Sequence, residues 1–330
     1  MNIKEMSIYK QFKPILLIIK KLGRKLKFNL NTLIKGRYFT HTEKRIYEKK
    51  LLENGYNFAL RDGNGDSLLT IAAIPAFEKL YKAKVKLFIK PSQEYLMKMF
   101  NITDYVIVET FVNKILYPIN INKTSFPQKG DIWFVNVRYN KETIKKSGYE
   151  CFNNFKEEIL NLLNLPLNTK LSLPANKLEI SEELNKKINF YNSLDKTILF
   201  IPEANSVVAG DLKYWEKLAS LLQKSGYSVI SNVICKEHYL KNASLNENFK
   251  MEDLIALGFS CKAVVSIRNG MCDILNSRGK DLFVFDTSQT TAQSKKFFNV
   301  NAMYDRNDVN EYDDENAISP EELVKKILGQ

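Results

Sequence analysis

Arg268, Asn269 and Gly270 form the tripeptide of this chain whose residue types and position best suit the binding of an anion. They follow an apolar, β-branched run at 262–267 and precede a short helical pattern at 271–277. The first N–H groups of a helix have no intrahelical partner, and a guanidinium adds fixed positive charge. Ligands of open α/β sheets lie beyond the carboxyl ends of the strands. The pattern therefore predicts a pyrophosphate site, unless it is an ordinary strand, turn and helix with a solvated Arg268.

The rest of the chain must supply the sheets that hold this tripeptide. Its 330 residues suffice for two domains. From residue 56 onward, strand patterns alternate with helical ones, which is typical of a mostly parallel sheet with helices on both faces. A polar segment with two prolines, 166–195, interrupts the alternation before it starts again. We therefore expect two doubly wound α/β domains, 51–165 and 196–318, joined by a linker at 166–195 and followed by a terminal helix at 319–330.

The individual elements follow from apolar periodicity and from turn residues. The expected strands are 56–60, 85–90, 105–109, 132–137, 197–201, 229–233, 262–267, 281–285 and 299–304. The expected helices are 67–82, 93–100, 151–163, 182–189, 212–224, 251–257, 271–277 and a segment that begins at Ser319. A glycine-rich turn, 61–66, follows the first strand, and 305–316 is expected to be a polar loop.

Residues 1–50 form a basic arm that holds nearly all of the chain's formal charge of +12. Apolar residues recur there at helical spacing beside lysines, which indicates an amphipathic helix. Its apolar run at 15–19 is far too short to cross a bilayer. The sequence leaves two roles open for the helix, docking on an anionic membrane surface or packing on the protein's own body. Because the folded body is close to neutral, we expect no nucleic-acid partner.

Cysteine and histidine are scarce. The four cysteines form no CxxC pair and no Cys/His ligand spacing, so we expect reduced thiols in the core of a cytosolic protein. His41 and His238 are the only histidines, and we expect both to be surface residues without a catalytic or metal-binding role.

Two longer stretches are more specific than the general alternation. The first, GDSLLTIAAIPAFEKLYKAKVKLFIKP, starts at Gly65 and opens a helix with Gly-Asp and a leucine pair. The second, TILFIPEANSVVAGDLKYWEKLASLLQKSGYSVISN, starts at Thr197 and carries a Trp near the start of a helix and Gly-Tyr before the next strand. Together they resemble the bacterial heptosyltransferase-like glycosyltransferases over residues 56–330. This resemblance implies the GT-B arrangement, two Rossmann-like domains facing a central cleft, with the acceptor bound mainly by the first and the nucleotide-sugar by the second.

The resemblance also implies roles for particular residues. Asp66 matches the family's general base, which takes a proton from the acceptor hydroxyl as it attacks the anomeric carbon with inversion. The structural alternative for Asp66 is that it only caps the N-terminus of the following helix. Gly63 and Gly65 form the acceptor-side turn beside it. Where the family has an Asp-Thr-Gly type turn and a nearby His, this chain has Arg-Asn-Gly, similar to arginine-using fucosyl-type transferases. Arg268 and the N–H groups near it would then stabilise the diphosphate leaving group.

Four other polar residues are candidate donor contacts. Asn205 and Ser206, in the first turn of the second domain, would contact a phosphate or form a simple polar turn. Glu252 or Asp253, at the start of an expected helix, would bond ribose hydroxyls or serve as favourable charge at a helix start.

The predicted activity is metal-independent transfer from a nucleotide-sugar to a surface glycan such as lipopolysaccharide or capsule, in the cytoplasm or at the inner membrane face. Asp62 and Asp66 are too far apart for a DxD pair that would hold a divalent cation, so no metal or other cofactor is expected. A non-catalytic, membrane-recruited α/β scaffold is the main alternative. A dinucleotide-dependent oxidoreductase is less favoured because 61–66 lacks the GxGxxG spacing.

Overall fold

The computed structural model describes most of the chain beyond the basic arm. The described residues are 49–60, 63–108, 128–130, 132–135, 153–188, 193–204, 210–286 and 292–330. The amphipathic helix predicted in the arm, His41, Asn205 and Ser206 lie outside these residues.

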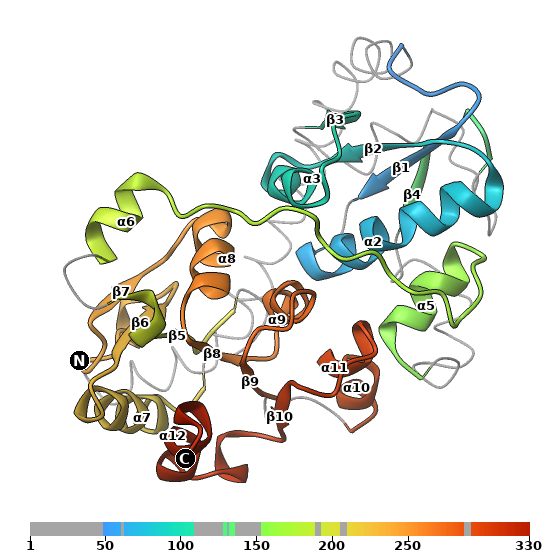
Figure 1. Ribbon diagram of the computed structural model, residues 1–330. Helices are drawn as coiled ribbons and strands as arrows, with labels where there is room; N and C mark the ends of the chain where they lie inside the picture. Colours follow the sequence, from blue (N-terminus) through green and yellow to red (C-terminus); the bar gives the residue numbers. More distant parts are fainter. Residues whose placement is uncertain are drawn as a thin grey trace, which may run out of the picture.

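A parallel four-stranded sheet in the order β3-β2-β1-β4 organises the first half. Asn57 of the central strand β1 pairs with Lys86 on one side and Ile132 on the other, which fixes the register. The strands are β1 (Tyr56–Leu60), β2 (Val85–Ile89), β3 (Tyr105–Ile107) and β4 (Ile132–Val135). The helices around them are α2 (Asn64–Tyr81), η1 (Pro91–Gln93), α3 (Glu94–Phe100) and α5 (Phe155–Leu162). They form the upper lobe of Figure 1.

A parallel six-stranded sheet in the order β10-β9-β8-β5-β6-β7 forms the second lobe. Its strands are β5 (Thr197–Ile201), β6 (Ser228–Asn232), β7 (Leu245–Glu247), β8 (Ala263–Ile267), β9 (Leu282–Phe285) and β10 (Asn310–Tyr312). Its helices are α6 (Glu182–Ile188), η4 (Leu194–Lys196), α7 (Leu212–Lys224), η5 (Lys236–His238), α8 (Met251–Ser260), α9 (Gly270–Asn276), α10 (Ala292–Phe297), α11 (Val300–Met303), η6 (Glu315–Ala317) and α12 (Pro320–Leu328). Every described strand pair is parallel, so the predicted α/β architecture with two parallel sheets is confirmed.

The protein has two apolar cores, one within the second lobe and one shared by both lobes. On one face of the second sheet, Trp215 of α7 packs edge-on against Phe200 and Phe285, with ring centroids 5.3 and 6.0 Å apart. The side chains of the other face, such as Leu199 and Val264, belong to a cluster that continues through α9 and α2 into the first sheet. Burial of this shared cluster ties the two lobes to each other through the hydrophobic effect.

Helix α5 adds a second connection between the lobes, because its first residues contact the end of the second lobe. Phe155 lies against Phe297 and Phe298, with centroids 5.8 and 5.5 Å away. Next to it, the buried amine of Lys156 bonds a carboxylate oxygen of Asp305 at 2.5 Å. A buried amine needs such a partner, so this ion pair fixes α5 against the second lobe.

Two sequence predictions near the C-terminus are wrong. Residues 299–304 contain the helix α11 rather than a strand, because the Asn299 side chain accepts the Ala302 N–H at 2.9 Å and caps a helical turn. The expected loop 305–316 contains β10, whose Tyr312 ring stacks on Phe285 of β9 at 5.3 Å. This strand lies at the edge of the sheet, where polar residues are common, so its sequence resembles that of a loop.

The predicted terminal helix is confirmed. Ser319 caps α12 by accepting the Glu322 N–H at 3.3 Å, and Glu322 returns a carboxylate oxygen to the Ser319 N–H at 3.2 Å. None of the helices in the described ranges is both long and apolar enough to span a bilayer.

Candidate active site

Asp66 lies in the first turn of α2, directly after the central strand of the first sheet. The helix begins at Asn64, so Asp66 is in the helix rather than in the predicted turn 61–66. Gly63 is the N-cap, and the Asp66 carboxylate accepts the Gly63 N–H at 3.3 Å. Asp66 is therefore not the N-cap residue of α2. Its carboxylate still accepts the Gly63 N–H and lies at the positive end of the helix dipole.

Arg268 directly follows β8, and its side chain is hydrogen-bonded within the protein. Its Nε donates to the Phe298 carbonyl at 2.7 Å, and its Nη1 to the Asn269 carbonyl at 2.5 Å. Nη2 forms an ion pair with Asp273 at 2.9 Å. The side chain is only 13% exposed, so the solvated alternative for Arg268 is wrong. Burial alone would lower the pKa of Arg268, but the neighbouring groups, Asp273 foremost among them, together outweigh burial and raise the pKa.

The helix that follows Arg268 begins one residue earlier than predicted, at Gly270. Asn269 is its N-cap, and the Asn269 side chain accepts the Met271 N–H at 2.8 Å. One of the helix-start N–H groups that the sequence offers to an anion is therefore already bonded inside the protein.

The starts of α2 and α9 meet between the lobes, as Figure 1 shows. A Cβ atom added to Gly65 would lie 3.0 Å from the Gly270 Cα and 2.8 Å from an Asp273 carboxylate oxygen. The two predicted half-sites, on Asp66 and on Arg268, are thus brought to the contact between the starts of α2 and α9, which we call the seam. The lobes are in contact at this point, so the open cleft expected between Asp66 and Arg268 is absent where α2 and α9 touch.

Three carboxyl groups lie near this seam, and the pKa values of two of them are raised. Burial raises the pKa of Asp273 to about 6, with Arg268 opposing the shift and Asp66 adding to it. Burial also raises the pKa of Glu158, on α5, to about 7, and Asp66 contributes through repulsion. Groups with pKa values near neutrality can both hold and release a proton at physiological pH. Sequence reasoning missed Glu158 and Asp273 because no local pattern places α5 beside α2, or Asp273 within reach of Asp66.

Glu252 and Asp253 contact other parts of the chain. Glu252 pairs with Lys98 of the first lobe at 2.9 Å. Asp253 accepts the N–H and the hydroxyl of Ser181 at 2.8 and 3.1 Å. Asp253 therefore connects the start of α8 to the segment before α6, and Glu252 connects it to the first lobe. That either residue binds a ribose hydroxyl stays a prediction.

Two surface cavities lie away from the seam. One of about 490 Å³ has basic walls, and the other, of about 460 Å³, contains the Lys98–Glu252 pair. Neither is lined by Asp66 or Arg268. The first is lined by Leu173, Pro174, Lys177, Phe259, Ser277, Arg278, Gly279, Lys280, Asp281 and Arg306.

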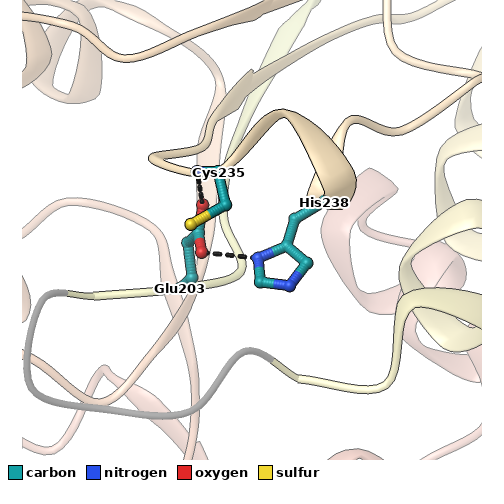
Figure 2. Close-up of side chains that lie close together, drawn as sticks. All are labelled: Glu203, Cys235 and His238. Atoms are coloured by element: carbon teal, nitrogen blue, oxygen red, sulfur yellow. Dashed lines mark hydrogen bonds and ion pairs between the residues drawn. The ribbon is translucent and has the colours of Figure 1, made fainter.

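His238 is not the isolated surface residue that the sequence predicts. Its Nδ1 lies 2.6 Å from a carboxylate oxygen of the buried Glu203, and Cys235 is close to both, as Figure 2 shows. Burial alone would raise the pKa of Glu203, but the Cys235 N–H and His238 hold it below its ordinary value. Cys235 and His238 stand in Cys-x-x-His spacing after a strand, so the expectation that no Cys/His ligand spacing occurs is wrong. Among the described residues this is the one cluster whose ligand atoms lie close enough to share a metal ion.

Two wholly parallel α/β lobes that meet at the helices following their central strands define a two-domain Rossmann-like protein, consistent with the GT-B class. Solved structures of this class match the chain along most of its length. A glycosyl transferase family 9 protein from Veillonella parvula DSM 2008 matches with a TM-score of 0.55 at 16% identity, covering 84% of this chain and 99% of that one. The ADP-heptose lipopolysaccharide heptosyltransferase II of E. coli matches with a TM-score of 0.56 at 12% identity, covering 83% and 98%.

The E. coli heptosyltransferase WaaC, solved with ADP-2-deoxy-2-fluoro heptose, matches with a TM-score of 0.53 at 8% identity, covering 83% of this chain and 99% of that one. No known family profile matches the chain, and no curated protein matches its sequence. At these identities the similarity establishes the fold, and the resemblance to heptosyltransferase-like proteins is confirmed at that level.

Proposed function

We propose that this protein is a glycosyltransferase that moves a sugar from a nucleotide-sugar donor to a hydroxyl of a bacterial surface glycan. The observation that carries the proposal is the position of Asp66. Its helix meets α9 at Gly65, so the carboxylate lies beside the buried Arg268–Asp273 pair at the seam of the two lobes. The matching structures are named as glycosyltransferases, which agrees with this reading of the site.

Asp66 is the proposed general base of the first domain, 51–165. It takes the proton of the acceptor hydroxyl while that oxygen attacks the anomeric carbon from the face opposite the leaving group, which inverts the configuration. Glu158 and Asp273 support this role because burial and the charge of Asp66 raise the pKa of both, so these carboxyl groups can hold a proton close to Asp66. Gly63 is proposed to leave room for the acceptor beside the start of α2, whereas the space beside Gly65 is filled by Gly270 and Asp273 in this structure.

The donor is assigned to the second domain, 196–318. Arg268 supplies the positive charge that offsets the diphosphate leaving group, with Asn269 and Gly270 next to it. Each nitrogen of the guanidinium already donates to a protein oxygen, so we infer that it acts through its charge, and that donor binding separates α2 from α9. Asn205 and Ser206 are proposed phosphate contacts and Glu252 a proposed ribose contact.

The transfer is proposed to need no divalent cation on the pyrophosphate, because Arg268 can supply the positive charge there. Magnesium and manganese prefer oxygen ligands, and no described cluster offers an all-oxygen set. Adding EDTA to the assay should leave the rate unchanged. Loss of activity that magnesium or manganese restores would contradict this point.

The acceptor is proposed to be a lipid-linked glycan reached from the cytoplasmic face of the membrane, with the basic arm 1–50 holding the enzyme on anionic lipid. Flotation of full-length and arm-deleted protein with liposomes tests this part. We expect binding to liposomes with anionic lipid that is lost on deletion. Equal behaviour of the two proteins would assign the arm to packing on the body.

A thermal-shift screen against GDP-, UDP-, ADP- and CMP-sugars, with NAD(H) and NADP(H) as controls, tests the function as a whole. Binding stabilises the folded state by mass action, so one nucleotide class should raise the Tm, and turnover should then release its nucleoside diphosphate. A shift with NAD(H) or NADP(H) alone would favour the oxidoreductase. No shift with any nucleotide would favour the scaffold.

A further inference from the structure

Glu203, Cys235 and His238 come together because β5 and β6 are parallel neighbours. Glu203 lies two residues after β5, Cys235 three residues after β6, and His238 ends the turn η5. Carboxyl ends of adjacent parallel strands lie side by side, about 5 Å apart, so the two loops meet at one edge of the sheet. Topology therefore brings Glu203 to Cys235 and His238, which already lie close together in the sequence.

The carboxylate of Glu203 is the fixed centre of the cluster. The residue is 5% exposed, and one carboxylate oxygen accepts the N–H groups of Ile234 and Cys235. The other oxygen faces His238 Nδ1 at 2.6 Å. One ligand atom from each of the three side chains lies within 4.8 Å of the others. A carboxylate that is oriented by backbone N–H groups on one oxygen is free to bind through the other.

The arrangement does not suit a cysteine nucleophile. Such a thiol needs an imidazole nitrogen as its base, within hydrogen-bond reach. Figure 2 shows His238 turned so that Nδ1 faces Glu203 while its other ring nitrogen points away from the Cys235 sulfur. One ligand atom of each side chain nevertheless lies within 4.8 Å of the other two.

We propose that this cluster binds a borderline transition-metal cation, with Zn²⁺ as the best fit. A thiolate, an imidazole and a carboxylate are all zinc ligands, and magnesium or calcium would require oxygen ligands. Bonds of about 2.0 to 2.3 Å in a tetrahedron place ligand atoms roughly 3.2 to 3.8 Å apart. The Glu203–His238 contact must then widen by about 1 Å, which a partly exposed His238 and an exposed Cys235 allow.

Three protein ligands leave the fourth position to water or to an anionic oxygen. The cation would clamp the loops that follow β5 and β6, one strand away from β8 and Arg268. It differs from a magnesium ion on a pyrophosphate, and it does not depend on the proposed transfer activity.

Metal binding to the untagged full-length protein tests this site. The protein is stripped with a zinc chelator, and Co²⁺ is added while thiolate-to-cobalt charge-transfer absorption is recorded, followed by competition with Zn²⁺. We expect one equivalent of Co²⁺ with a single-thiolate band that Zn²⁺ abolishes. Cys235→Ser should lose the band, and His238→Asn should weaken metal affinity at least about tenfold.

Matched substitutions elsewhere provide the controls. Cys261→Ala removes a buried thiol outside the cluster and His41→Asn removes the other histidine, and both should keep the band. Circular dichroism confirms that each variant is folded. Glu203→Gln keeps an oxygen for the N–H groups of Ile234 and Cys235 and should still weaken metal binding. Absence of stoichiometric Co²⁺ and Zn²⁺ binding, or a band that survives Cys235→Ser, would overturn the proposal.

Discussion

The backbones of Gly65 and Gly270 touch across the two lobes. A Cβ on Gly65 would come within 2.8 Å of an Asp273 oxygen, and a Cβ on Gly270 would lie 3.0 Å from the Gly65 nitrogen. Both distances are shorter than ordinary contacts, so α2 and α9 approach this closely only because neither residue has a side chain. The same contact sets how far Asp66 lies from the Arg268–Asp273 pair.

Gly65→Ala should force the two helices apart. Overpacking of this kind costs about 1–3 kcal/mol, offset in part by the better helix propensity of alanine. Hydrogen exchange of the α9 amides should become faster. Gly63→Ala is the matched control, because its Cβ would meet only an Asp66 oxygen at 3.7 Å. Equal exchange in α9 for the two variants would mean that the glycine contact does not hold the lobes.

Asp66→Asn should reduce turnover by about 10²- to 10⁴-fold, the usual contribution of a general base, with donor affinity nearly unchanged. The amide retains the shape and an oxygen for the Gly63 N–H, so folding should persist. Steady-state kinetics and calorimetry with the donor measure the two effects. Asp104→Asn, at a residue paired with Lys86, is the control and should leave both unchanged. A full rate in Asp66→Asn would remove it from the mechanism.

Substitution of Arg268 needs a compensated design because the side chain has two expected roles. Arg268→Ala leaves Asp273 buried without its partner, at a cost of about 3–5 kcal/mol in stability. Arg268→Ala with Asp273→Asn removes both charges and should regain part of that loss. If Arg268 offsets the diphosphate, nucleoside diphosphate binding should still be weaker by about 1.5–3 kcal/mol in the double variant than in Asp273→Asn alone. Equal affinities by calorimetry would restrict Arg268 to a structural role.

Strands buried on both faces could be predicted from sequence almost to the residue. Residues 56–60 and 197–201 are uniformly buried in the structure, and nearly continuous apolar runs announce them. Helix α7 has the bounds that the sequence predicts, 212–224, because its apolar residues recur at helical spacing. Residues 299–304 were misread because a four-residue helix is too short to show a period.

The site was only half predictable for a different reason. Arg268 and Asp66 carry local signals, a polar residue at the junction of a strand and a helix. The positions of Glu158 and Glu203 depend on which elements lie side by side, and neither residue stands in a motif. Strand order and lobe packing arise from the whole chain, so the sequence around Glu158 or Glu203 does not show which groups these carboxylates will meet.

The last prediction concerns Glu158, whose pKa is raised from 4.5 to about 7 by burial and by Asp66. The folded state therefore binds this proton more tightly than the unfolded state, so the stability it gives is complete below about pH 4.5 and is lost as pH rises through 7. Glu158→Gln stays neutral and escapes this loss. After allowance for partial exposure, the variant should exceed the parent by about 1–2 kcal/mol above pH 8 and match it near pH 4.

Urea denaturation of both proteins between pH 4 and pH 9 measures that difference. Asp66→Asn provides an independent check, because removing its charge should lower the pKa of Glu158 and move the loss of stability toward lower pH. A stability difference between Glu158→Gln and the parent that stays constant with pH would show that the pKa of Glu158 is the same in the folded and unfolded states. Glu158 would then be ionised at neutral pH and could not hold a proton beside Asp66.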